Sequence, residues 1–169
     1  MAIAQSLLPE FDNEMKSTRA LLERVPDGLD DYKPHPKSSS LASLAAHVAG
    51  LPRLGFSALQ PDAEYDFDPP GGKKFTPPKF QSSAINVANF DELVTKTREA
   101  IANASDEFLM QPWTLKYQGN KLFTMPRIAV LRGMMMNHLI HHRGQLTVYL
   151  RMNDVPLPRI YGPTADEPM

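Results

Sequence analysis

The longest periodic stretch of the sequence is MPRIAVLRGMMMNHLIHHRGQLTVYLR, residues 125–151. Side chains recur in it at steps of three and four residues, which is the spacing of one inward-facing helical seam. The seam consists of Ile128, Leu131, Met135, His138, His142, Gln145 and Tyr149. Pro126 suits the first position of a helix, where a missing N–H costs little. The pattern predicts one long helix from Pro126 to about Met152.

Two histidines, His138 and His142, interrupt this apolar seam near its centre. Four residues along a helix rise about 6 Å and share one face, so both imidazole rings can reach one metal ion. A buried polar group without a partner costs on the order of 1–3 kcal/mol, and either a metal ion or a hydrogen-bonding core group removes that cost. Periodicity alone leaves both interpretations open. The same spacing places the neighbouring His141 outside the seam.

His47 is the best-placed third ligand. It lies in a second predicted helix, residues 41–59, beside the inward-facing Val48. Ser40 is expected to cap this helix, and Pro52 is expected to bend it about one turn after His47, because proline cannot donate the next backbone hydrogen bond. His35 lies between two prolines in a loop and is interpreted as a solvated side chain.

Two further helices are predicted from apolar periodicity, over residues 7–24 and residues 90–103. Ser6 is expected to cap the first helix, with Pro9 in its first turn. Asn89 and Glu92 resemble a capping box for the second.

The remaining segments contain turn and loop residues. Residues 26–40 read as a loop, and residues 60–83, with five prolines and a Gly-Gly pair, read as a long crossover that lies over a pocket. Residues 113–125 predict a hairpin that turns at Gly119-Asn120. The sequence therefore predicts one all-α domain over residues 1–169, a four-helix bundle with a long crossover loop and a minor β-hairpin before the last helix.

The composition excludes several classes of site. The 169 residues include no cysteine, so disulfides and zinc–thiolate sites are absent, and the formal net charge is −1. No basic run could follow a phosphate backbone, and no apolar stretch approaches the roughly 20 residues of a membrane span. We therefore expect a cytoplasmic protein with no nucleic-acid partner and no membrane partner.

Two stretches resemble the DinB family of metal-binding four-helix bundles: HPKSSSLASLAAHVAGLPR, residues 35–53, and residues 125–151, above all NHLIHHRGQLTVYL. The tail, residues 155–168, is similar to one branch of that family. The resemblance implies one divalent metal ion held by His47, His138 and His142. It also implies thiol S-transfer or isomerase activity, a low-molecular-weight thiol as partner, and a homodimer.

Three histidine ligands leave a coordination position open, as in catalytic rather than structural zinc sites, although nickel and iron also suit imidazole. The favoured hypothesis is a metal-dependent thiol S-transferase that acts on small electrophiles. Gln145 and Tyr149, one and two turns beyond His142, are expected either to line the substrate pocket or to be ordinary interior residues. Arg143 is interpreted as a solvated or interface residue.

Other chemistries stay open at this point. The protein could be a metal-dependent hydrolase or isomerase, or a non-catalytic metal-stabilised binding protein. No carboxylate lies on the histidine face of the last helix, so a general base would have to come from Glu64, Asp66 or Asp68 in the crossover.

Overall fold

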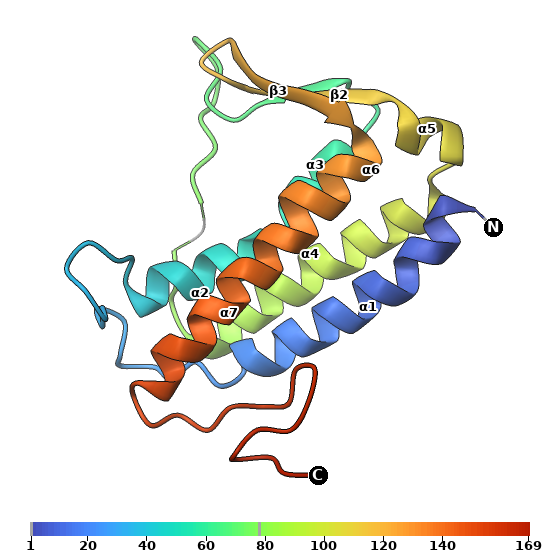
Figure 1. Ribbon diagram of the computed structural model, residues 1–169. Helices are drawn as coiled ribbons and strands as arrows, with labels where there is room; N and C mark the ends of the chain where they lie inside the picture. The colour runs from blue at the N-terminus through green and yellow to red at the C-terminus, as the bar shows by residue number, and fades with distance from the viewer. Residues whose placement is uncertain (1, 78) are drawn as a thin grey trace.

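The computed structural model describes residues 2–77 and 79–169, and it is mostly helical with a small sheet (Figure 1). Its helices are α1 (Ile3–Leu22), α2 (Leu41–Gly50), α3 (Pro52–Ala58), α4 (Ser83–Asn103), α5 (Asp106–Met110), α6 (Arg127–Ala129), the π-helix η1 (Val130–Asn137) and α7 (His138–Arg151). Its strands are β1 (Glu64–Asp66), β2 (Pro112–Tyr117) and β3 (Asn120–Pro126). None of the helices formed by the described residues is long and apolar enough to cross a membrane.

The helices pack around one core, with α4 against α1, α2 and α3, and with α7 against α1 and α2. Phe11, Phe90 and Leu131 lie fully buried in this core. Figure 1 shows the sheet at one end of the helices, next to α3 and α6, and the C-terminal segment at the other end. The helix α2 therefore lies beside α7 in the half of the molecule that is remote from the sheet.

The first helix begins at Ile3, earlier than the sequence predicted, and Ser6 is not its cap. The reason is a tertiary contact: the backbone N–H of Ile3 donates to Oδ1 of Asp106 at 2.7 Å. Asp106 belongs to α5, a short helix that periodicity did not reveal. Pro9 consequently lies inside the helix and not in its first turn.

The second helix is broken at Leu51, as the position of Pro52 predicted, into α2 and α3. Proline cannot donate to the carbonyl of Val48, and the N–H of Leu51 bonds to that carbonyl instead, at 3.4 Å. The predicted cap is confirmed, because Oγ of Ser40 accepts from the N–H of Ser43 at 3.2 Å.

Replacing Ser40 with alanine is expected to lower the free energy of unfolding by about 1 kcal/mol, because one N–H at the start of α2 loses its acceptor. Urea denaturation of the metal-free protein measures this change. The variant Ser40→Asp keeps an acceptor and should stay within a few tenths of a kcal/mol of the wild type. Equal losses in both variants would show that the hydroxyl does not act as a cap.

The fourth helix begins at Ser83, so the predicted start at Phe90 is wrong and Asn89 lies inside the helix. Two contacts fix the true start. Oγ of Ser82 accepts from the N–H of Ile85 at 3.3 Å, and Oδ1 of Asp27 accepts from the N–H of Ser83 at 2.7 Å. Asp27 comes from the loop after α1, a contact that local sequence does not encode.

The long C-terminal helix contains a π-helical segment, η1, that shifts its buried stripe by one residue. Within η1 the buried positions repeat at intervals of five residues: Val130 with Met135, and Leu131 with Met136. A π-helix bonds each carbonyl to the N–H five residues on, so its turn is wider than an α-turn. Downstream, the buried stripe of α7 is Leu139, Arg143, Leu146 and Leu150. The predicted inward seam through His138 and His142 is therefore displaced by one residue.

The sheet has the order β1-β2-β3, with β1 parallel to β2 and β2 antiparallel to β3. The predicted hairpin is present, but Tyr117 pairs with Asn120, so its turn residues are Gln118 and Gly119, both with positive φ. The strand β1 lies inside the predicted crossover, which is therefore not entirely loop. Within the part of the chain that the structure describes, its residues form a ladder with β2, a partner about 50 residues away in sequence.

Arg143 is buried and not solvated, which corrects the sequence-based interpretation. Its side chain is 2% exposed and forms an ion pair of 2.7 Å with Oε2 of Glu14 on α1. It also donates to the hydroxyl of Tyr161 at 2.7 Å, and that hydroxyl donates to Oε2 of Glu14 at 2.9 Å. Tyr161 belongs to the C-terminal segment, which this network ties to α1 and α7.

Candidate metal centre

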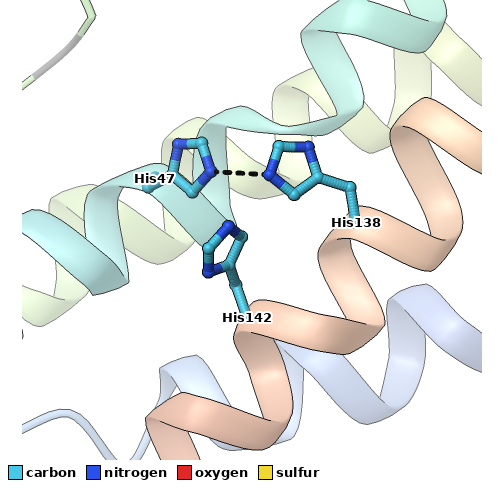
Figure 2. A group of neighbouring side chains, drawn as sticks. All are labelled: His47, His138 and His142. Carbon is cyan, nitrogen blue, oxygen red and sulfur yellow. Dashed lines mark hydrogen bonds between the residues drawn. The ribbon is translucent and has the colours of Figure 1, made fainter.

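Three histidines from two helices meet between α2 and α7 (Figure 2). His47 comes from α2, and His138 and His142 come from the first two turns of α7. The ring centroids form a nearly equilateral triangle: 5.1 Å for His47–His138, 4.6 Å for His47–His142 and 4.7 Å for His138–His142. The structure thus brings together all three histidines that the sequence singled out.

The nitrogen atoms of this cluster converge on one point. Nε2 of His47 lies 3.3 Å from Nε2 of His138, and one nitrogen of each ring lies within 4.8 Å of the other two. A tetrahedral ion with bonds of about 2.1 Å would separate two ligand nitrogens by about 3.4 Å. The donor set therefore fits a divalent ion that prefers imidazole, with a small adjustment of the third ring.

The cluster lies at the edge of the core and is partly open to solvent. His47 is exposed, and His138 and His142 are half-buried. The prediction that these rings point into the bundle core is wrong, and η1 is the reason, because its wide turn places Leu139 where periodicity placed His138. One side of a bound ion would consequently face solvent.

Desolvation between the packed rings and mutual repulsion favour the uncharged forms of His47 and His138. Desolvation lowers the pKa of His47 to about 4, and the neighbouring His142 and His138 add to this shift. The pKa of His138 is also lowered, first by burial and then by His142, and the carbonyl of Met134 partly offsets the shift. Histidine binds metal through a neutral nitrogen, so these shifts keep two ligands ready to bind at neutral pH.

The lowered pKa of His47 predicts a pH-dependent stability of the metal-free protein. The unfolded chain binds this proton near the ordinary pKa of 6.5, but the folded chain binds it only near 4. Between these values the unfolded state holds more protons, so the free energy of unfolding should fall as the pH falls.

The variant His47→Gln removes this titration. We therefore expect the wild type to lose more stability than His47→Gln between pH 7 and pH 4, in denaturation series with a chelator present. Parallel pH curves for the two proteins would contradict the shift of the pKa.

An open groove of about 920 Å³ adjoins the cluster. Its wall includes His47 and His142, together with Gln145 and Tyr149 from the next turns of α7. Residues 76–77 and 79–80 of the crossover also line this groove, so the crossover borders a pocket as the sequence suggested. The apolar and polar groups of this wall could hold a small organic molecule beside the metal centre.

Gln145 and Tyr149 differ in what they touch. Oε1 of Gln145 lies 2.7 Å from Nδ1 of His142, whereas Tyr149 donates from its hydroxyl to the carbonyl of Ser39 at 3.2 Å. The ring of Tyr149 also meets the ring of Tyr32 edge to face, with centroids 6.2 Å apart. Tyr149 therefore fixes the loop before α2, and Gln145 contacts a candidate ligand directly.

The other sequence candidates are not part of the group whose nitrogens converge. His141 is exposed beside His142, with centroids 4.8 Å apart, and His35 is exposed in the loop before α2. The acidic residues of the crossover are held at the sheet. Glu64 pairs with Lys116 at 2.6 Å, and Asp66 accepts from the backbone N–H of Gly119 at 2.7 Å. They do not supply a general base in this arrangement.

Sequence reasoning missed several groove residues. Asp30 and Asp31, the serines of residues 38–40, and Lys79 and Phe80 also line the groove. They come from two loops without periodicity, and the signal that could have pointed to them is the dense run of serines directly before the helix of His47.

Comparisons with known proteins agree with the fold. A family model described as the DinB superfamily matches residues 10–146. A DinB-like protein from Bacillus cereus is 22% identical, with a TM-score of 0.73 over 95% of this chain and 98% of that chain. A DinB-like protein from Bacillus subtilis is 20% identical, with a TM-score of 0.64 over 92% of this chain and 97% of that chain. No curated protein matches the sequence.

Proposed function

The chain belongs to the DinB superfamily, and on this premise we propose that it is a divalent-metal-binding protein that catalyses thiol S-transfer to small electrophiles. The convergence of His47, His138 and His142 beside an open groove carries the proposal. Zinc, nickel and iron all suit three imidazole ligands, so the proposed ion is one of these three metals.

The partial exposure of the cluster favours an enzyme over a purely structural metal site. Structural zinc sites have four protein ligands, whereas catalytic sites have three and one open position. Here three histidines converge at the edge of the core, and the groove begins at His47 and His142. A substrate atom could therefore approach the centre from the groove.

Each part of the site has a distinct task in this proposal. The three histidines supply neutral nitrogen ligands, and the lowered pKa values of His47 and His138 keep protons from competing for them. A divalent ion would lower the pKa of a bound thiol and make it a nucleophile at neutral pH. Gln145 and Tyr149 would contact the substrate along the groove wall.

The first experiment measures metal content by elemental mass spectrometry on untagged protein, before and after addition of zinc or nickel. The proposal expects about one ion per chain. Absence of bound metal after both additions would make the three histidines structural and would remove the basis of the proposal.

The second experiment tests the reaction. Metal-loaded and chelator-treated protein are incubated with a low-molecular-weight thiol and an activated aryl halide, and thioether formation is followed by absorbance. The proposal expects metal-dependent formation of the thioether. Stoichiometric metal without any thioether would instead favour a hydrolase, an isomerase or a non-catalytic binding protein. The homodimer is a separate proposal, which light scattering after size-exclusion chromatography tests.

A further inference from the structure

We propose that Gln145 is a positioning residue that fixes the tautomer and orientation of His142 for metal binding. This inference rests on the proposed metal centre, but it concerns a contact that is present in the protein without metal. Oε1 of Gln145 lies 2.7 Å from Nδ1 of His142, three residues earlier on the same helix.

The chemistry of the two groups sets the direction of this hydrogen bond. An amide oxygen only accepts, so Nδ1 of His142 must carry the proton. A neutral imidazole has one proton, and Nε2 is then left with a free lone pair. Figure 2 shows one nitrogen of His142 turned toward the other two rings and the other nitrogen turned away. Because Nδ1 is held by Gln145, the nitrogen that faces the cluster is Nε2.

The opposite orientation of the amide would be incompatible with a metal ligand. If the NH2 group faced Nδ1, that nitrogen would accept, and the ring proton would sit on Nε2 inside the cluster. Nε2 of His47 and Nε2 of His138 already lie 3.3 Å apart at that place. The orientation with Oε1 toward His142 clears the proton from the site and raises the basicity of the ligand.

The same contact limits what Gln145 does for a substrate. Its oxygen is engaged by His142, which leaves the two N–H groups of the amide as donors for a molecule in the groove that Gln145 lines. A ligand at this position could therefore accept a hydrogen bond from the amide of Gln145. Gln145 consequently couples the orientation of one metal ligand to the polar wall of the groove.

Two substitutions separate this role from simple space filling. Gln145→Met has a similar length but no acceptor, and Gln145→Glu keeps an acceptor and makes it charged. Loss of an outer hydrogen-bonding partner of a histidine ligand typically weakens metal affinity by about 10–100-fold. We expect that loss in Gln145→Met and an affinity equal to or tighter than wild type in Gln145→Glu, measured by competition titration with zinc. Equal affinities in the methionine variant and the wild type would overturn the inference.

A second readout does not depend on metal. Nitrogen-15 chemical shifts of the His142 ring report its tautomer in the metal-free protein. We expect the Nδ1–H form in the wild type and in Gln145→Glu, and a mixture of tautomers in Gln145→Met. An unchanged tautomer in Gln145→Met would overturn the inference even if affinity fell. If the wild type shows the expected tautomer and binds no metal, the proposed function fails and the positioning contact stands.

Discussion

Replacing His138 with alanine is expected to weaken metal binding by more than about 100-fold, beyond the upper range for loss of an outer partner of a ligand. His138 supplies one of the three converging nitrogens, and its Nε2 lies 3.3 Å from Nε2 of His47. With two imidazole ligands remaining, water would have to fill two of the four coordination positions of a tetrahedral ion. Elemental mass spectrometry of the purified variant measures the loss, and competition titration with zinc gives the affinity.

His141 offers a matched control for this experiment. It lies on the same helix three residues later and carries the same side chain, but it is exposed and outside the group whose nitrogens converge. His141→Ala should therefore retain about one ion per chain. His47→Ala, on the other helix, should lose the ion as His138→Ala does.

These three variants also separate two explanations for a negative result. Loss of metal in all three would indicate a general loss of structure, which circular dichroism would reveal. Full retention of metal in His138→Ala would contradict the assignment of the three ligands. Loss in His47→Ala and His138→Ala, with retention in His141→Ala, is the pattern that the geometry requires.

Truncation of Glu14 to alanine is expected to destabilise the fold by about 3–5 kcal/mol, because it leaves the guanidinium of Arg143 buried without its counter-charge. The two side chains are 8% and 2% exposed and lie 2.7 Å apart. For a chain of this size, such a loss lowers the melting temperature by roughly 2–4 °C for each kcal/mol. Urea denaturation with a chelator present measures the change without a contribution from metal.

Glu10 provides the matched control for this truncation. It lies one turn earlier on α1 and pairs with Arg132 of the C-terminal helix at 2.6 Å, but the two side chains are 37% and 52% exposed. Exposed ion pairs contribute about 0–1 kcal/mol, so Glu10→Ala should change stability little. Similar losses in Glu10→Ala and Glu14→Ala would show that burial of the Arg143 pair is not what makes it important.

A double variant tests the physical reason for the effect. When both partners of a buried ion pair are replaced by apolar side chains, the desolvation cost disappears together with the attraction. Glu14→Leu combined with Arg143→Leu should therefore be more stable than Glu14→Ala alone. The hydroxyl of Tyr161, which contacts both charged groups, would then lose its partners, so the C-terminal segment should become more sensitive to proteolysis.

The sequence by itself determined the long helical segments, although not their ends or the short α5, together with the break at Pro52, the cap at Ser40 and the three histidines that converge. These features depend on residue type and on spacing within one or two helical turns. Proline removes a donor wherever it stands, and a serine before a helix accepts from the first turn. Two histidines four residues apart share one helix face, whether that face points into the core or lies at its edge.

The tertiary structure decided where the helices begin, which way the histidines face and what surrounds them. Asp106 accepts from the N–H of Ile3 at the start of α1, and Asp27 accepts from the N–H of Ser83 at the start of α4. Both acceptors are distant in sequence from the helix ends that they stabilise. The π-helix η1 shifts the buried stripe by one residue, which moves the histidines from the core to its edge and buries Arg143 against Glu14. These outcomes follow from packing between segments, and a local pattern of residues carries no information about the partner that a distant segment provides.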